Sequence, residues 1–142
     1  MNFLKGKRVL AIEHFMAAPL CTQMLGDFGA EVIKVEKPKK GDTTRGIPPF
    51  YKGKSLYYEA YNRNKKSITL DINKSEGRDI FIKMVKLADI IVVNISKKTL
   101  ERIGLDYESL NKINKRTIMA IVSGFGLTGK YQYRKAFDPI IQ

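Results

Sequence analysis

Short apolar runs alternate with amphipathic segments along the chain, and the runs have the length of β-strands. They cover residues 8–12, 31–35, 67–72, 89–93 and 117–122. The third run alternates and is rich in β-branched residues, which favour strands. The fourth run carries the strongest signal, because an unbroken apolar run suits a parallel strand that is covered on both faces.

The segments between these runs carry apolar residues at helical spacing. The first helix is predicted to begin near Pro19, which helices tolerate at their start, and to end at Gly29. Its apolar positions are Leu20, Met24, Leu25 and Phe28. Asn73 and Glu76 predict a capping box before a second helix. The apolar stripe of that helix is Ile80, Phe81, Met84, Val85 and Ala88. Shorter helices are predicted at residues 97–103, ending at Gly104, and at 107–112.

This alternation predicts an α/β domain with a mainly parallel sheet flanked by helices. Ligands of such sheets bind beyond the carboxyl ends of the strands. Those ends are predicted at residues 13–16, 36–40, 94–98 and 123–126. The stretch 37–55 is rich in Pro and Gly and is predicted to be a long loop, a kind of segment that is usually functional or mobile.

Length and composition fit one globular domain, with 142 residues of which 44% are hydrophobic and 28% charged. No apolar run reaches the roughly 18 residues of a membrane span. The first residues lack the apolar stretch of a signal peptide. The one cysteine, Cys21, cannot form an internal disulfide, and a cytoplasmic protein is the expectation.

The chain is strongly basic, with 26 Lys and Arg against 14 Asp and Glu and a formal net charge of +12. This charge favours an anionic partner and leaves nucleic acid, a nucleotide-like cofactor and an acidic membrane surface open. Most of the cations are lysines, whereas the readout of nucleic-acid bases prefers the arginine fork. Several cations fall in the predicted edge loops, and a solvated surface without a partner is the alternative interpretation.

Residues 124–129 match the pattern G-x-G-x-x-G after a predicted strand. A dinucleotide-binding fingerprint also needs a helix that opens within the motif and an acidic residue about 20 positions later. No helical stripe follows Gly129, and the fingerprint normally follows the first strand of a sheet rather than the last. Turn glycines are therefore the favoured interpretation.

The only histidine, His14, lies just after the first strand, at the ligand edge of the predicted sheet. It could act as a general base. The sequence places only the adjacent Glu13 near it as a partner that could orient the ring, so a structural or lining role is favoured. Cys21 lies on the apolar side of the first helix and is predicted to be a buried small residue. One His and one Cys cannot form a metal site of the ordinary His/Cys type, so no metal is predicted.

A series of motifs runs in order through nearly the whole chain. They lie at residues 4–10, 17–36, 41–46, 62–71, 75–78, 88–94, 102–105 and 123–129. Their most distinctive parts read CTQMLGDFGAEVIKVE, GDTTRG, NRNKKSITLD and SGFGLTG. Together they resemble the N-terminal portion of the family III CoA-transferases, the CaiB/BaiF-like relatives of formyl-CoA transferase, carnitine CoA-transferase and α-methylacyl-CoA racemase. Such an ordered series is far more specific than any one motif.

The resemblance implies that residues 1–142 are a Rossmann-like region that binds coenzyme A or an acyl-CoA at the edge of its sheet, without a metal. The implied substrates are an acyl-CoA and a carboxylic acid. Two chains interlock in the family, so the resemblance implies a homodimer or a companion chain that carries the remaining part. It implies binding neither to a membrane nor to nucleic acid. By position, the resemblance makes these residues candidates for lining the CoA site: Phe15, Met16, Ala17, Lys37, Leu70, Asn94, Ile95, Ser96, Thr99, Arg102, Lys135, Ala136 and Phe137.

The resemblance also implies a mechanism in which an aspartate forms anhydride and thioester intermediates. By position this aspartate and the second domain of the family lie beyond Gln142, and Asp138 matches a different position. We therefore expect no catalytic residue among the 142 and no CoA transfer by this chain alone. Racemase relatives carry a histidine base where Phe137 stands, which argues against racemisation.

Two other interpretations are kept. The first is a non-catalytic CoA-binding or nucleotide-binding subunit, or a truncated relic, that needs a partner chain; the apolar residues 139–141 favour it as part of a sticky surface. The second is a basic nucleic-acid-binding protein. The net charge favours this second interpretation, but the sequence has no helix-turn-helix, zinc or RNP-type pattern.

Overall fold

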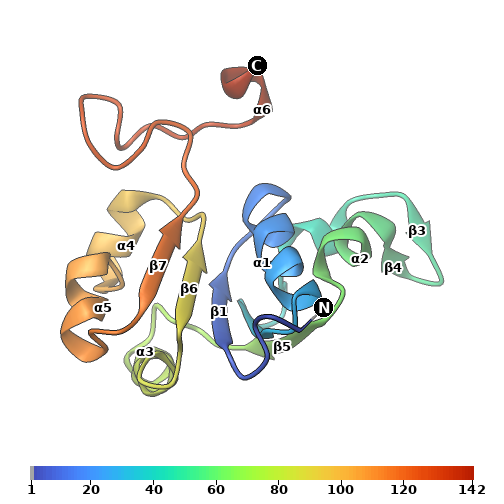
Figure 1. The fold of residues 1–142 in the computed structure, drawn as a ribbon. Coiled ribbons are helices and arrows are strands. Elements are labelled where there is room, and N and C mark those ends of the chain that lie inside the picture. The colour runs from blue at the N-terminus through green and yellow to red at the C-terminus, as the bar shows by residue number, and fades with distance from the viewer. Residues whose placement is uncertain (1) are drawn as a thin grey trace.

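Five parallel strands form the central sheet of the computed structural model, which describes residues 2–142 (Figure 1). The strands are β1 (Arg8–Ile12), β2 (Glu31–Glu36), β5 (Lys65–Thr69), β6 (Ile90–Val93) and β7 (Ile118–Ile121). Their order across the sheet is β5-β2-β1-β6-β7, and every neighbouring pair is parallel. The chain therefore builds one half of the sheet outward from β1 and then crosses back to place β6 on the other side of β1, as in Rossmann folds. The predicted fold class is confirmed.

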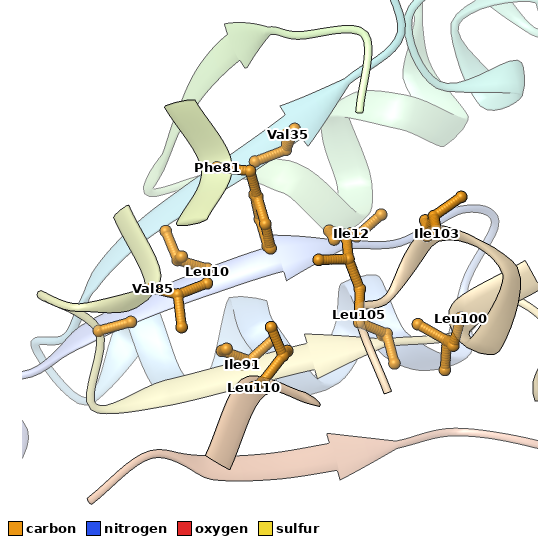
Figure 2. Packing of buried hydrophobic residues seen from close by; sticks show 12 residues of the cluster. Leu10, Ile12, Val35, Phe81, Val85, Ile91, Leu100, Ile103, Leu105 and Leu110 are labelled. Atoms are coloured by element: carbon orange, nitrogen blue, oxygen red, sulfur yellow. The ribbon is translucent and has the colours of Figure 1, made fainter. Parts of the chain in front are cut away.

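Helices cover both faces of the sheet (Figure 1). One face is covered by α1 (Ala17–Asp27), and the other by α3 (Ser75–Val85), α4 (Lys97–Ile103) and α5 (Tyr107–Ile113). Successive side chains of β1 alternate between the two faces. Val9 packs in the smaller cluster under α1, whereas Leu10 joins the larger cluster against α3, α4 and α5. Figure 2 shows this larger cluster, with Phe81 and Val85 of α3 lying against the sheet near Leu10 of β1.

The two outer strands differ from the prediction. β7 is shorter than the predicted run 117–122, and it lies at the edge of the sheet, where Ile118 is 65% exposed. β5 begins at Lys65, two residues before the predicted run, and ends at Thr69. A search for apolar runs misses the first two residues of the strand, because they are the charged Lys65 and Lys66, which bind Glu13 and Glu31.

The apolar stripe of α1 does not face the core as an amphipathic helix would predict. Leu20, Met24 and Phe28 are 42%, 51% and 42% exposed. The helix instead buries Ala18, Pro19, Thr22 and Gln23, small or polar residues that let it approach the sheet closely. Cys21 is only half-buried, which corrects its prediction as a buried residue, and burial together with the charge of Glu13 raises the pKa of its thiol.

The capping box predicted before α3 is wrong. The helix begins at Ser75, and its N-cap residue, Lys74, makes no side-chain cap. The Asn73 backbone N–H instead donates to the Asp71 carboxylate at 3.2 Å, forming an Asx-type turn. A Cβ at Gly77 would overlap the Asp71 carbonyl, so glycine is required for this close approach. By contrast, α4 ends as predicted at Gly104, which has the left-handed φ of 65°.

The predicted loop at residues 37–55 is shaped by a short 3₁₀ helix, η1 (Thr43–Gly46), and a hairpin of β3 (Phe50–Tyr51) and β4 (Lys54–Ser55). A helix with three tyrosines, α2 (Leu56–Asn62), follows. After β7 the chain crosses above the carboxyl ends of the strands to α6 (Asp138–Ile141) (Figure 1). No helix opens within residues 124–129, which confirms the turn interpretation of the glycine motif. Within residues 2–142, none of the helices is both long and apolar enough to span a membrane.

Candidate functional site at the carboxyl edge of the sheet

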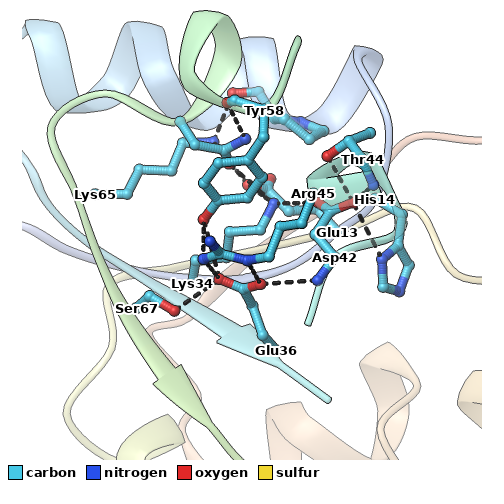
Figure 3. A network of polar contacts seen from close by, with 12 residues as sticks. Glu13, His14, Lys34, Glu36, Asp42, Thr44, Arg45, Tyr58, Lys65 and Ser67 are labelled. Atoms are coloured by element: carbon cyan, nitrogen blue, oxygen red, sulfur yellow. Dashed lines mark hydrogen bonds and ion pairs between the residues drawn. The ribbon is translucent and has the colours of Figure 1, made fainter. Parts of the chain in front are cut away.

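A buried network of charged side chains joins the end of β1 to β2 and to the start of β5 (Figure 3). Lys34 of β2 is 0% exposed, and its Nζ donates to Asp42 Oδ2 at 2.6 Å and to Asn62 Oδ1 at 2.9 Å. The same Nζ lies 3.6 Å from Glu13 Oε1. Since a buried charge is tolerated only when it is paired and hydrogen-bonded, each of these contacts is needed to hold Lys34 in the core.

A second ammonium completes the network. Lys65 Nζ of β5 donates to Glu13 Oε1 and to the Pro19 carbonyl, both at 2.8 Å. The Thr22 hydroxyl of α1 lies 2.9 Å from both Glu13 oxygens. Burial lowers the pKa of Lys65, against the effect of Glu13. Two ammonium groups and two carboxylates thus join three strands, α1 and the loop that carries Asp42.

A second group of contacts centres on Glu36, the last residue of β2. Its carboxylate accepts hydrogen bonds from Arg45 (Nε 2.7 Å, Nη2 2.7 Å), Ser67 Oγ (2.7 Å), Tyr58 OH (3.0 Å) and the Asp42 backbone N–H (2.8 Å). The Arg45 guanidinium lies 3.8 Å from the centre of the Tyr58 ring. Burial opposes the ionised form, but these donors lower the pKa of Glu36 to about 2. The 37–47 stretch is thereby fastened to the sheet through a single carboxylate.

Asp42 fastens the same loop through the first network. It accepts hydrogen bonds from the Thr44 backbone N–H at 2.9 Å and from Lys34, and it caps η1. Burial raises the pKa of Asp42, but the neighbouring His14 and Lys34 outweigh it and hold that pKa well below the usual range. His14 Nδ1 lies 3.9 Å from Asp42 Oδ1, too far for a hydrogen bond.

The fastened loop forms a basic pocket of about 240 Å³. Its lining residues are Glu36, Lys37, Lys39, Lys40, Gly41, Arg45, Ser67 and Thr69. The Glu36 charge is already matched by Arg45, so the lysines give the pocket a net positive charge. Ammonium donors recognise phosphate. The pocket can therefore hold a phosphorylated anion.

The crevice between β1 and β6 is the topological switch point of the sheet, where Rossmann folds bind their ligands. Asn94 bridges it, accepting from the His14 N–H at 2.9 Å and donating to the His14 carbonyl at 2.6 Å. Phe15 then adopts the left-handed φ of 64°, which is uncommon for a bulky residue. Its ring meets that of Phe137 edge-on, with 5.7 Å between the ring centres. The bridge and the turn thus hold Phe15 at the mouth of the crevice.

The residues that follow Asn94 are held by the start of α4. The Ser96 hydroxyl caps the helix by accepting from the Thr99 N–H at 3.3 Å. Lys97 Nζ donates to the Leu127 carbonyl at 2.9 Å and also contacts Gln132 Oε1. Arg102 donates to Asn73 Oδ1 at 3.1 Å.

The candidates implied by the resemblance therefore fall into groups rather than one pocket. Lys37 lines the basic pocket, which is not lined by the crevice residues. Phe15, Asn94 and Phe137 lie at the crevice, where Phe15 contacts Phe137. Met16 and Ala17 lie at the start of α1, and Ser96 and Thr99 lie at the start of α4. Leu70 and Ile95 pack on the larger core cluster, and Arg102 binds Asn73. Lys135 and Ala136 lie in the segment before Phe137.

Sequence reasoning missed the residues that organise this edge. Lys34, Asp42 and Lys65 were not candidates, although each belongs to a motif that carries the family resemblance. A signal was present, because Lys34 stands between Ile33 and Val35 in the apolar middle of the strand, and a charge there needs buried partners. Among residues 2–142, no group of three or more His, Cys, Asp or Glu side chains is arranged to hold a metal ion.

Comparison with known proteins agrees with the motifs. The profile of the family described as CoA-transferase family III matches residues 4–142. The chain belongs to the family III CoA-transferases. It is 46% identical over 138 residues to the succinyl-CoA–D-citramalate CoA-transferase of Chloroflexus aurantiacus, which covers 96% of this chain and 34% of that protein. It is 41% identical over 140 residues to a formyl-CoA:oxalate CoA-transferase of Rhodopseudomonas palustris, covering 98% of this chain and 33% of that protein.

The fold agrees with that of a solved structure as well. The crystal structure of a CAIB/BAIF family protein from Brucella suis superposes with a TM-score of 0.93 at 40% identity, over 99% of this chain and 38% of that chain. The family III chain described here thus spans about a third of the length of the curated relatives that it matches. Its five-stranded sheet corresponds to part of the CaiB/BaiF fold.

Proposed function

We propose that residues 1–142 are the CoA-binding, Rossmann-like region of a CoA-transferase that moves CoA between an acyl-CoA and a free carboxylic acid. The observation that carries this proposal is the basic pocket at the carboxyl edge of β2 and β5, where Lys37 and its neighbours face a space suited to phosphate. CoA is a polyanion with three phosphate groups on its nucleotide end and a long arm in which methyl and methylene groups alternate with two amides. At the crevice between β1 and β6, the rings of Phe15 and Phe137 are placed to pack against such an arm.

In this proposal the residues of the chain bind and orient. Lys37 and, farther along the edge, Arg102 and Lys135 neutralise phosphates, and Asn94 keeps the β1 turn in place beside the arm. The buried network holds the loop of Lys37 against the sheet, so that its ammonium groups are positioned before the ligand arrives. The family resemblance matches none of these 142 residues to the aspartate that carries the acyl group, so the proposal assigns the chemistry of transfer to residues outside them.

Changing Lys37 to glutamate is expected to weaken CoA binding about tenfold or more, because a charge-assisted hydrogen bond is replaced by repulsion. The salt dependence of the dissociation constant should also become flatter. Isothermal titration calorimetry with CoA at two salt concentrations measures both. Lys115→Glu is the matched control, because Lys115 is an exposed lysine before β7, at the opposite end of the sheet. Equal effects of the two changes would mean that net charge alone attracts CoA, and unchanged affinity in Lys37→Glu would remove Lys37 from the site.

Thioester exchange by the 142-residue chain is expected to stay at the uncatalysed rate, since a covalent route without its carboxylate is lost. The measurement follows CoA transfer from succinyl-CoA to a free carboxylic acid by chromatography. A chain that still binds CoA but does not transfer it agrees with the proposal. Exchange that scales with the concentration of the purified chain would contradict it.

An alternative is a non-catalytic CoA-binding subunit that pairs with a second polypeptide. The exposed stripe of α1 favours it, because Met16, Leu20, Met24 and Phe28 follow one another at four-residue spacing and Phe3 extends the stripe beside Phe28. Both proposals place CoA at the same edge. They differ in whether exchange is restored by residues that continue this chain or only by a separate one.

A further inference from the structure

The segment that follows β7 closes on itself at Gly124 and Ala136. A Cβ atom at Gly124 would overlap the Cβ of Ala136 and would touch Ile141 Cδ1 at 3.5 Å. The backbone of Gly124 is not in the left-handed region, in contrast to Gly126 and Gly129, which have φ values of 75° and 80°. Glycine is therefore required at this position by space and not by conformation.

The residues between these two points form a loop packed by its own side chains. The rings of Phe125 and Tyr131 lie 5.7 Å apart, and the Arg134 guanidinium stacks 4.6 Å from the centre of the Tyr131 ring. Lys97 of α4 fastens the loop from below by donating to the Leu127 carbonyl, and its Nζ lies 5.3 Å from the centre of the Tyr133 ring. Such compact loops with adjoining ends are Ω-loops, and they are frequently functional.

The last residues of this loop, Lys135, Ala136 and Phe137, lie at the carboxyl edge of the sheet. Figure 1 shows the segment crossing above the strand ends, with α6 beyond the N-terminal end of α1. The contact between Phe137 and Phe15 then joins the loop exit to the turn after β1. The distance at which Ala136 packs on Gly124 thus decides where Phe137 lies relative to Phe15.

We propose that Gly124 is a positioning residue for the coenzyme-binding edge: its missing side chain lets Ala136 close the loop, which places the Phe137 ring opposite Phe15 and fixes the backbone of Lys135 just before it. The part that concerns CoA affinity rests on the proposed function. The ligand class is the same, an anionic nucleotide with a long arm. Gly124 acts through its neighbours and does not itself touch the ligand.

The test is the variant Gly124→Ala, measured by calorimetry with CoA and by NMR for the nuclear Overhauser effect between the Phe15 and Phe137 rings. CoA affinity is expected to fall about tenfold, because the cation and the ring are displaced together. The Overhauser effect between the rings should disappear, while those between β1 and β6 persist. Gly26→Ala is the control. Gly26 lies in α1, where an added Cβ would meet its neighbours at an ordinary 3.5 Å, and both readouts should stay at the wild-type level.

A size swap makes the test independent of general destabilisation. In Gly124→Ala/Ala136→Gly the two Cβ atoms no longer compete, so the Overhauser effect between the rings should return and the affinity should match that of Ala136→Gly alone. A double variant that is no better than Gly124→Ala would overturn the positioning role.

The two proposals can fail separately. In one outcome the wild-type protein binds no CoA, but Gly124→Ala still separates the Phe15 and Phe137 rings and the size swap restores their contact. That result would contradict the proposed function and support the role of Gly124 in placing Phe137. Wild-type affinity in Gly124→Ala, whether or not the rings separate, would show that Gly124 does not position the coenzyme-binding edge.

Discussion

Replacing Lys34 by methionine is expected to lower the free energy of unfolding by about 3–5 kcal/mol, the usual cost of removing one partner of a buried ion pair. Methionine matches the aliphatic stem of lysine, so packing in β2 changes little. What is lost is the ammonium, 2.6 Å from Asp42, whose side chain is 0% exposed. The carboxylate is then left in the interior with hydrogen bonds only from Thr44. Urea unfolding followed by circular dichroism measures the loss.

Two further variants distinguish the loss of the buried ion pair from a general sensitivity of these strands to substitution. Lys66→Met removes an ammonium from β5 whose side chain is 72% exposed and lies 2.7 Å from Glu31, and it should cost less than about 1 kcal/mol. Adding Asp42→Asn to Lys34→Met should recover part of the stability, because a neutral amide needs no ammonium and its oxygen can still accept from Thr44. Equal losses in Lys34→Met and Lys66→Met would contradict the role given to the network.

Acid is expected to remove about 3 kcal/mol of stability through Glu36 alone, because each unit of pKa difference corresponds to about 1.4 kcal/mol. Its side chain is 2% exposed, and donors led by Arg45 lower its pKa from the ordinary 4.5 to about 2 against the effect of burial. The folded pKa is the lower one, so this stabilisation is fully present above about pH 4.5 and is lost as the pH falls towards 2. Unfolding midpoints in urea between pH 2 and pH 7 measure the loss.

The variant Glu36→Gln isolates this contribution from that of Asp42, whose pKa is also held below its usual range. The amide keeps the shape of the side chain but has no charge for Arg45. The difference in stability between wild type and variant should be largest near neutral pH and should vanish near pH 2. A difference that stays constant over this range would mean that Glu36 acts through packing and not through its charge.

The order of strands and helices could be predicted from the sequence because burial dictates it. Ile91 and Val93 lie in the larger core cluster and Val92 in the smaller one, and Gly104 ends α4 in the left-handed conformation. The stripe of α1 misled the prediction, because periodicity shows that one face of a helix is apolar but not whether this chain covers it. The predicted capping box failed for a related reason, since the nearby Asp71 supplies a competing turn.

The candidate site was only partly predictable. The topology rule placed Phe15, Asn94 and Lys37 at strand ends, and the structure places them there. The buried network was missed because Lys34, Asp42 and Lys65 come from three segments that meet only in the folded chain. The contact of Phe15 with Phe137 depends likewise on a loop closure that no local pattern encodes.

The central claim is that CoA binds across the carboxyl edge of this sheet, and mapping amide shifts of the labelled chain during titration with CoA tests it most directly. The account predicts saturable shifts in the 37–45 loop, at Phe15 and Asn94, and at residues 135–137, with little change in α5 or at the amino ends of the strands. Shifts spread over lysines all around the surface and abolished by moderate salt, or confined to a different face, would contradict it.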